Sequence, residues 1–435
     1  MSRPTDALLL ALAVSGGGCA YWWNEAEVES AQQYVASARR ELGKGNVQLA
    51  ADLLERARVR FRNDEAVLRW SIELRRMQGR DQEALRLLLE LRRNDNLRSI
   101  SRRELDGQIG ELLFRLGKYS ESAHFLHGGD SGPRAEQRRA VAGIAQLLGY
   151  VRPEPDYRPV ETKLFGGTWP AMVCGFGDKQ RLGLLDTGSS MCTLSKSFAD
   201  EVGVAGLSEF GMVRDSLGEK CSAWIGVLPS LTIAGVGVGP LPVIVVEDER
   251  LALRDWYGGP DHAPSAIVGL DVLHAFRMVC DLPQHVARFE RPRGLREPDT
   301  AACLFVDGCL LVPVEVDGVA MWFILDTAAG QSSLTDVGMR VLPGGAGRAI
   351  PDHRQARSLR GRGFIARKVV GLVLRVSAVK FANVELPVVE RLSESSFPVH
   401  GVLGVDLLEH CRLTLDSGRM LLERITPATP SGRPR

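Results

Sequence analysis

The sequence lacks a surplus of charge of either sign. Its 435 residues carry 54 Lys and Arg against 53 Asp and Glu, a formal net charge of +1. A protein that binds nucleic acid through bulk charge needs a basic surplus or a strong basic stripe, because it must neutralise phosphates. The balance therefore argues against such a protein, and we predict no nucleic-acid partner.

Long apolar runs are also absent. No stretch of 18 or more apolar residues occurs, whereas a membrane-spanning helix needs about 20, so an ordinary membrane-spanning helix is excluded. Apolar residues still make up 45% of the chain and charged residues 25%, which is typical of a globular protein. At about 150 residues per domain, the length predicts three folded units.

Cysteine is too sparse to stabilise a chain of this length through disulfides. The eight cysteines form no CxxC pair, no HExxH motif accompanies them, and the eight histidines are scattered. We therefore predict no metal site and no cofactor. Most cysteines are expected to be small buried hydrophobic residues.

Residues 1–24 have the features of an export signal. Arg3 precedes the apolar stretch Ala7–Val14, and small residues then lead to Cys19. This order is typical of a secretory signal peptide, and a cysteine directly after small residues resembles a bacterial lipoprotein signal, in which it is lipidated. Gly16 stands where such signals usually carry a large aliphatic residue, so an ordinary signal peptide or a disordered N-terminus remains open. The two signal interpretations predict export to the bacterial cell envelope, and the lipidated one adds a membrane tether through Cys19.

Residues 25–150 predict an array of α-helices. Segments such as Gln48–Arg60 carry apolar residues at i, i+3 and i+4 spacing, with charged residues on the other face. Gly45, Gly79 and Gly117 each precede a helical segment, at spacings of 34 and 38 residues. Helical hairpins with a period near 34 residues resemble tetratricopeptide repeats. The full consensus is absent, so a generic array of helical hairpins is the alternative; either kind usually binds a protein partner or positions a neighbouring domain.

The residue pattern changes after a proline-rich linker at residues 151–160. Short runs of Val, Ile, Leu and Gly replace the helical pattern, which predicts strands separated by glycine turns. A second linker-like stretch divides this part into residues 161–295 and 301–424. The tail, residues 425–435, is proline-rich and predicted to be disordered.

The two strand-rich parts are copies of one plan. Each has two apolar residues followed by Asp-Thr-Gly or Asp-Thr-Ala, and later two apolar residues followed by glycine. The distance from aspartate to that glycine is 83 residues in the first copy and 78 in the second. The matching positions are Asp186, Thr187, Gly188, Ser189 and Gly269 in the first copy and Asp326, Thr327, Ala328, Ala329 and Gly404 in the second.

With these motifs, each copy resembles a subunit of a retropepsin-type aspartic protease. The pair resembles a single-chain, two-lobed, pepsin-like pseudo-dimer over residues 157–424. The fold class expected is therefore multidomain, with an α-helical repeat array followed by an all-β-rich, two-lobed aspartic protease. The resemblance implies an endopeptidase that acts on a peptide or protein substrate without a cofactor.

The resemblance also implies a role for each motif residue. Asp186 and Asp326 would meet at a pseudo-twofold axis and share one proton. Ionising both of two carboxyl groups that lie so close together is energetically unfavourable. One would activate a water while the other supplies a proton, and the pair titrates as a unit. Thr187 and Thr327 would hydrogen-bond to the backbone of the opposite loop. Gly269 and Gly404 would lie beneath the loops and allow close backbone approach, and Gly188 would allow a tight turn.

Lobe two departs from the family pattern at two positions. Ala328 stands in place of glycine, which adds a methyl group beside the aspartates and disfavours positive φ angles. Ser189 could hydrogen-bond to Asp186, whereas Ala329 has no hydroxyl for Asp326. Either the variation is tolerated in an active enzyme, or the chain is a non-catalytic envelope scaffold or peptide-binding pseudoprotease. Activity is favoured because both aspartates and both threonines are present.

Further residues are duplicated between the lobes, and we expect structural roles for the aspartates among them, capping helices or ending strands. Two segments, residues 213–220 and 357–368, lie where each lobe could place a hairpin over a cleft. Ordinary exposed hairpins are the favoured explanation for both segments. The duplicated residues are Asp271, Arg277 and Asp281 in lobe one and Asp406, Arg412 and Asp416 in lobe two.

Overall fold

A computed structural model describes most of the chain. The described residues are 30–94, 97–126, 135–149, 155–165, 169–214, 220–251, 263–352, 355–358, 361–364, 367–389 and 397–425. The predicted export signal, with Cys19, and the predicted tail from residue 426 lie outside the described residues. Among those that are described, no helix combines the length and apolar character needed to cross a bilayer.

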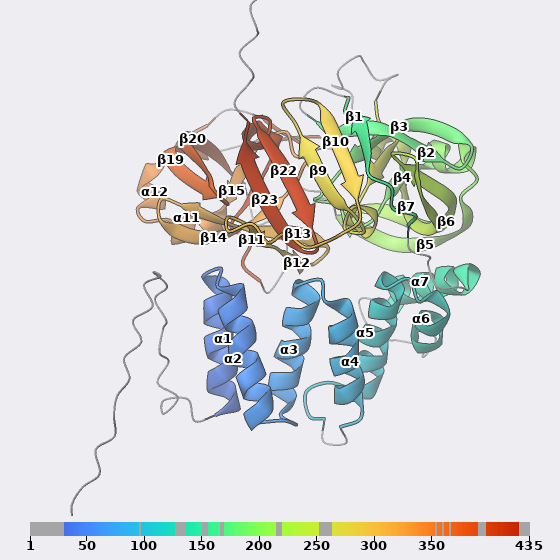
Figure 1. Ribbon diagram of the computed structural model, residues 1–435, viewed down its shortest axis with the longest axis horizontal. Coiled ribbons are helices and arrows are strands. Elements are labelled where there is room, and N and C mark those ends of the chain that lie inside the picture. Colours follow the sequence, from blue (N-terminus) through green and yellow to red (C-terminus); the bar gives the residue numbers. More distant parts are fainter. Residues whose placement is uncertain are drawn as a thin grey trace, which may run out of the picture.

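The N-terminal region is helical, as the sequence predicted (Figure 1). Positive φ angles of 85°, 69° and 70° at Gly45, Gly79 and Gly117 turn the chain between the helices of three successive pairs, because glycine adopts this conformation without steric cost. The tetratricopeptide class remains a prediction. The helices are α1 (Ala31–Gly43), α2 (Val47–Arg60), α3 (Glu65–Met77), α4 (Asp81–Arg92), α5 (Arg102–Arg115), α6 (Tyr119–Leu126) and α7 (Ala135–Leu148).

Lobe one is built on a seven-stranded sheet in the order β2-β3-β8-β4-β7-β6-β5. The strands β3 and β8 run parallel, and β3 leads directly to Asp186. The strands are β2 (Ala171–Phe176), β3 (Lys179–Leu185), β4 (Thr193–Ser195), β5 (Ala205–Arg214), β6 (Lys220–Ile233), β7 (Val236–Val246) and β8 (Ala266–Val268), with helices α8 (Lys196–Glu201), α9 (Asp248–Leu251) and α10 (Leu270–Leu273).

Lobe two repeats this plan in an eight-stranded sheet, β12-β13-β14-β21-β15-β20-β19-β16, beside a separate β17–β18 hairpin. An Asp-Gly turn joins β13 to β14, with φ angles of 47° at Asp317 and 84° at Gly318. The strands are β12 (Leu304–Val306), β13 (Cys309–Val316), β14 (Val319–Leu325), β15 (Ser333–Thr335), β16 (Ala349–Pro351), β17 (Gln355–Ser358), β18 (Gly361–Phe364), β19 (Arg367–Val376), β20 (Val379–Val389) and β21 (Gly401–Leu403), with helices α11 (Asp336–Val341), α12 (Gly345–Arg348) and α13 (Val405–Leu408).

A third sheet joins the lobes, and each lobe contributes three of its six strands. Its order is β1-β10-β9-β22-β23-β11, so that β9 of lobe one pairs with β22 of lobe two. No sequence pattern predicted this sheet. Its strands are β1 (Val160–Lys163), β9 (Arg277–Asp281), β10 (Val286–Glu290), β11 (Ala301–Ala302), β22 (Cys411–Asp416) and β23 (Arg419–Arg424).

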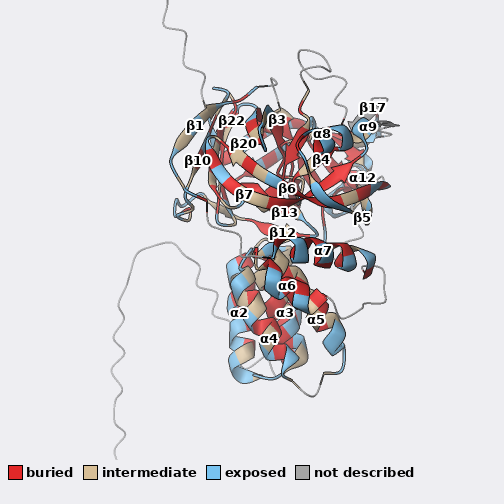
Figure 2. Cartoon of the chain, turned by 90° about the vertical axis from the view of Figure 1, so that its right-hand side faces the viewer, coloured by how far each residue is buried: buried red, intermediate tan, exposed pale blue. Residues whose placement is uncertain are grey.

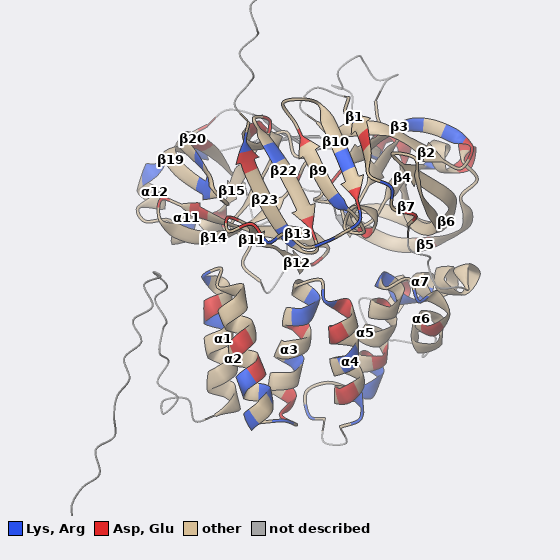
Figure 3. Ribbon diagram, in the orientation of Figure 1, with Lys and Arg blue, Asp and Glu red and all other residues tan. Residues whose placement is uncertain are grey.

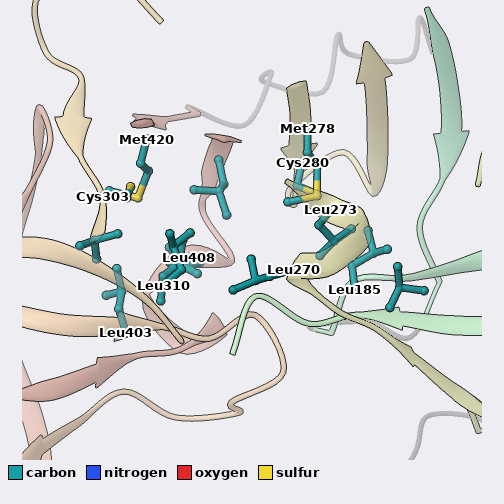
Figure 4. Close-up of a cluster of buried hydrophobic side chains, with 14 of the residues drawn as sticks. Leu185, Leu270, Leu273, Met278, Cys280, Cys303, Leu310, Leu403, Leu408 and Met420 are labelled. Carbon is teal, nitrogen blue, oxygen red and sulfur yellow. The ribbon is translucent and has the colours of Figure 1, made fainter. Parts of the chain in front are cut away.

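One apolar core runs through both lobes without a break. Figure 4 shows side chains from the two lobes facing each other beside this sheet, among them Leu270 and Leu273 of α10 and Leu408 of α13. The seven described cysteines are all free thiols and all but Cys309 are buried, which confirms that most act as small apolar residues. Because burial is continuous, the lobes fold as one body rather than as two domains.

The helical array packs against both lobes (Figure 2). Helices α1 to α3 share an apolar cluster with lobe two, in which Trp322 is fully buried and its Nε1–H donates to the carbonyl oxygen of Leu42 at 2.9 Å. Helix α7 shares a second cluster with lobe one, in which Ile144 and Ile225 are buried. The array therefore spans the two lobes.

Candidate active site

Two equivalent loops form the site. β3 ends at Leu185 and β14 at Leu325, and an aspartate follows each strand. The Asp186 N–H donates to the carbonyl oxygen of Val268 at 3.0 Å, and the Asp326 N–H donates to that of Leu403 at 3.0 Å. The start of each loop is therefore held by the neighbouring parallel strand of its own lobe.

The two loops are locked together by their threonines, which are 0% and 1% exposed. Each backbone N–H of Thr187 and Thr327 donates to the hydroxyl oxygen of the other at 3.1 Å. The Thr187 hydroxyl donates to the carbonyl oxygen of Leu325 at 2.8 Å, and the Thr327 hydroxyl donates to that of Leu185 at 2.6 Å. These are the cross-axis hydrogen bonds that the family pattern implied, and they bring the two aspartates to the same place.

The aspartate carboxyl groups meet beside Gly188. A Cβ atom added to Gly188 would lie 2.7 Å from Cγ of Asp326 and 3.1 Å from Oδ1 of Asp186. Asp186 is only 8% exposed and Asp326 only 6%. The structure therefore joins the predicted pair in one nearly buried site, which we call the dyad.

Burial is the main cause of the dyad's electrostatics. It raises the pKa of Asp186 well above the usual value, and the nearby charge of Asp326 raises that pKa further. Burial also raises the pKa of Asp326, against the effect of backbone N–H groups that stabilise its ionised form. Because the two groups interact this closely, we treat the dyad as one unit that holds one proton, without assigning the proton to either residue.

Backbone N–H groups, rather than side chains, hold the carboxylates in both loops. The Ser189 hydroxyl donates to the carbonyl oxygen of Met191 at 3.1 Å and is not bonded to Asp186, which corrects our expectation for it. In lobe two the Ala329 N–H donates to Oδ1 of Asp326 at 2.8 Å. The missing hydroxyl of Ala329 therefore removes no contact with the carboxylate.

Ala328 is accommodated without the expected backbone strain. Its φ is not positive, and its methyl group packs against an apolar cluster of lobe one that contains Ala171 and Leu184. Its N–H donates to Oδ1 of Asp326 at 2.9 Å, as the Gly188 N–H does to Oδ1 of Asp186 at 2.7 Å. The alanine thus preserves the hydrogen bond that the glycine makes in lobe one.

The two distant glycines lie under the loops, where no side chain fits. A Cβ on Gly269 would lie 2.6 Å from the carbonyl carbon of Met191, and one on Gly404 would lie 2.7 Å from the carbonyl oxygen of Ala329. Real Cβ atoms do not approach backbone this closely, so glycine is required at both positions. The structure places them where the motif predicted.

Asp271 and Asp406 hold the dyad loops, which refines our expectation of helix capping. Asp406 also accepts from the N–H of Leu407 in its own helix α13, at 3.0 Å. Oδ1 of Asp271 accepts from the N–H of Cys192 at 3.0 Å. Oδ1 of Asp406 accepts from the N–H and the hydroxyl of Ser332 at 2.8 Å and 2.6 Å. Neither carboxylate belongs to the dyad, and each ties the far end of a dyad loop to the segment after the glycine.

Two residues that flank the dyad loops, Cys309 and Trp169, were not predicted from the sequence. Cys309 lies with Sγ 3.9 Å from the carbonyl oxygen of Gly188, and burial together with the dyad charges raises its pKa to about 12. Trp169 lies beside Gly330, whose added Cβ would be 3.5 Å from the indole ring. Trp169 and Cys309 differ by 140 residues, the same offset as the two aspartates. That offset is the signal that could have found them.

Hairpins occur at both positions considered for flaps. β5 and β6 pair up to Arg214 and Lys220, and β17 pairs with β18. The tips, at residues 215–219 and 359–360, lie outside the described residues. Their assignment as flaps remains a hypothesis.

Part of the chain matches a known protein family. Residues 169–272, which include the dyad loop of lobe one and Gly269, match the family model described as aspartyl protease. Among solved structures, the chain is similar to an aspartic proteinase from Irpex lacteus, at 12% identity and a TM-score of 0.38 over 63% of this chain and 100% of that one. It is also similar to a retropepsin-like aspartic protease from Rickettsia conorii, at 15% identity and a TM-score of 0.23 over 32% of this chain and 93% of that one. No curated protein matches the chain.

The surroundings of Gly188 and Ala328 predict opposite outcomes for two single-methyl changes. Gly188→Ala places a methyl group against the Asp326 carboxyl group, so the carboxyl groups must move apart. A displacement of about 1 Å in an active site costs about 10²-fold in rate, and we expect a loss of kcat of that order. Ala328→Gly is the matched control and should keep kcat near wild type. Steady-state kinetics on a peptide substrate tests this, and wild-type kcat for a folded Gly188→Ala variant would contradict it.

The raised pKa of Asp186 predicts a stability change that depends on pH. A carboxyl group whose pKa is higher in the folded state stabilises the protein at low pH, and this contribution is lost as pH rises through the folded pKa. Asp186→Asn removes the ionisation but keeps an oxygen for the Gly188 N–H. We expect this variant to unfold at a higher temperature than wild type at pH 7, with the difference vanishing below about pH 4, the ordinary Asp pKa. Thermal unfolding from pH 3 to 8 measures it; a difference independent of pH would refute the assignment.

Proposed function

We propose that the protein is an aspartic endopeptidase, which hydrolyses peptide bonds with a water activated between Asp186 and Asp326. The observation that supports this most directly is the meeting of two nearly buried carboxyl groups at one glycine, with burial raising the pKa of both. A carboxyl pair that retains one proton near neutral pH can act as a general acid and a general base together.

In this mechanism the ionised carboxyl group removes a proton from the water while the water oxygen attacks the carbonyl carbon of the peptide bond. The protonated carboxyl group gives its proton to the carbonyl oxygen, which forms a tetrahedral diol. The diol then collapses: the C–N bond breaks, the nitrogen takes a proton from the dyad, and a diol hydroxyl returns one. The dyad ends with the single proton it began with.

The loops supply positioning for these steps. Backbone N–H groups hydrogen-bond to each carboxylate and orient it, and the buried threonines fix the two loops relative to each other. Donors that are already oriented need not reorganise as charge moves in the transition state, which is where such sites gain most of their rate.

Recruitment of a partner or substrate by the helical array is part of the proposal. Helices α1 to α3 and α7 use apolar residues to pack on the lobes. Acidic and basic residues are distributed along the helices, including the parts that point away from the lobes (Figure 3). A recruiting surface would therefore be polar and would lie on the side of the array away from the lobes.

A second candidate is the peptide-binding pseudoprotease or envelope scaffold, and one contact favours it. Ile324 lies two residues before Asp326, so its side chain points to the same side of the chain as strands alternate. Ile324 is buried in the cluster that α1 to α3 form with lobe two. The array thus packs against the strand that leads to the dyad of lobe two, and a substrate that needed this side of the strand would be excluded.

Peptide cleavage by wild type, Asp186→Asn and Asp326→Asn separates the two functions. If the dyad is catalytic, wild type cleaves members of a peptide library and each variant loses about 10² to 10⁴ of its rate. Asp178→Asn, in the exposed turn between β2 and β3, is the matched control and should retain full activity. Cleavage that persists in both dyad variants would reject the catalytic assignment, while peptide binding by wild type without cleavage would favour the pseudoprotease.

The location we propose is the bacterial cell envelope, with a lipid on Cys19 as the tether. This rests on the export signal in the sequence alone. Cys19→Ala should move the protein from the membrane fraction to the soluble fraction after cell lysis. An unchanged distribution would exclude the tether.

A further inference from the structure

Two ion pairs cross between the lobes in a reciprocal arrangement. The Arg412 guanidinium of lobe two donates to Oδ2 of Asp281 in lobe one, at 3.0 Å from Nε and 2.7 Å from Nη2. In the other direction, Nη1 of Arg277 in lobe one lies 3.6 Å from Oδ2 of Asp416 in lobe two, while its Nε lies 3.5 Å from Oε2 of Glu290 in its own lobe. Each lobe therefore contributes one arginine and one aspartate, as in an interface between identical subunits related by a twofold axis.

The acidic partners of both pairs are buried. Asp281 is 4% exposed and Asp416 is 2% exposed. Oδ1 of Asp281 also accepts from the backbone N–H of Gln284 at 3.2 Å, and Oδ2 of Asp416 accepts from that of Arg293 at 3.2 Å. Oδ1 of Asp416 accepts from the hydroxyl of Ser417 at 2.8 Å. A buried carboxylate that loses its cationic partner is strongly unfavourable. The pairs therefore penalise any arrangement of the lobes that separates them.

The pairs mark one register of the β9–β22 contact. In that register Arg412 lies opposite Asp281 and Thr414 lies opposite Val279. A slip of one residue would turn the charged side chains toward the apolar core. A slip of two would place Asp281 opposite Thr414, and a slip of four would oppose Arg277 with Arg412, or one aspartate with the other. Only the observed register gives each of these four residues a partner of opposite charge in the other lobe.

A short connection links this register to the dyad. Arg277 follows Gly269 by eight residues and Arg412 follows Gly404 by eight, through α10 and α13. At the start of these helices, the Leu270 N–H donates to the carbonyl oxygen of Ser189 at 2.8 Å, and Val405 makes the same bond to Ala329 at 2.9 Å. A shift of β9 along β22 would therefore move one dyad loop relative to the other.

We propose that the pairs Arg412–Asp281 and Arg277–Asp416 are positioning residues, which set the register of the two lobes and thereby the spacing of the dyad carboxyl groups. They act through the glycine segments and do not touch substrate. The proposal rests on the peptidase function proposed above, and it extends that function to four residues on the far side of the core from the dyad loops.

The test uses the full chain with Asp281→Asn, Arg412→Gln and the exchanged pair Asp281→Arg with Arg412→Asp. We expect each single variant to lose about ten- to 100-fold in kcat, as for a small misplacement of reacting groups, with KM changed less. The exchanged pair should recover most of the loss. Glu161→Gln is the matched control, because the Glu161–Arg288 pair joins β1 and β10 of the same sheet within lobe one and is exposed.

The pH profile separates positioning from simple destabilisation. If the carboxyl groups move apart, each feels less of the other's charge, and the basic limb of the kcat profile should shift to lower pH. A loss of folded protein would lower the profile at every pH without moving the limb. Unshifted limbs in folded single variants, or no recovery in a folded exchanged pair, would overturn the proposal.

The same question can be answered without activity. Titration of ¹³C-labelled aspartate carboxyl groups by NMR, with Asp186→Asn and Asp326→Asn spectra for assignment, reports the dyad protonation directly. The dyad has two titration steps. If the higher of its two pKa values falls in Asp281→Asn, positioning is supported even if wild type cleaves no peptide. An unchanged dyad titration refutes positioning whether or not the protein is a peptidase.

Discussion

This fold has to hold two carboxyl groups against each other in a nearly buried site. Such an arrangement is unfavourable when both groups are ionised, so the surrounding fold must hold it in place and leave one proton on the pair. Backbone N–H groups aim each carboxylate, and the buried threonines Thr187 and Thr327 prevent the loops from separating. Everything farther out serves to keep these two loops at one distance.

That requirement explains why the chain is joined across its pseudo-twofold axis at several levels. The threonines connect the loops, one apolar core fills the space behind them, and the six-stranded sheet takes three strands from each lobe. The helical array then contacts lobe two through α1 to α3 and lobe one through α7. An array that spans both lobes resists their relative movement and also covers surface beside the dyad.

The sequence predicted the local features of this fold well. The turn glycines Gly45, Gly79 and Gly117 lie between the two helices of each pair, because the conformation of a turn depends on a few adjacent residues. It was less informative about contacts. The Ser189 hydroxyl turns to Met191, and Ala328 fits without a positive φ, because the space around each residue comes from segments far away in the chain.

The sequence by itself determined that the chain has two copies of one lobe, each with an aspartate after an apolar strand and a glycine about 80 residues later. A duplicated pattern can be read from spacing alone, since both copies are present in the same order. The folded structure was needed to show how deeply the two carboxyl groups are buried, which residues flank them, and that Arg412 pairs with Asp281. These facts join residues more than 100 positions apart, and no local periodicity encodes which distant surfaces meet when the apolar core closes.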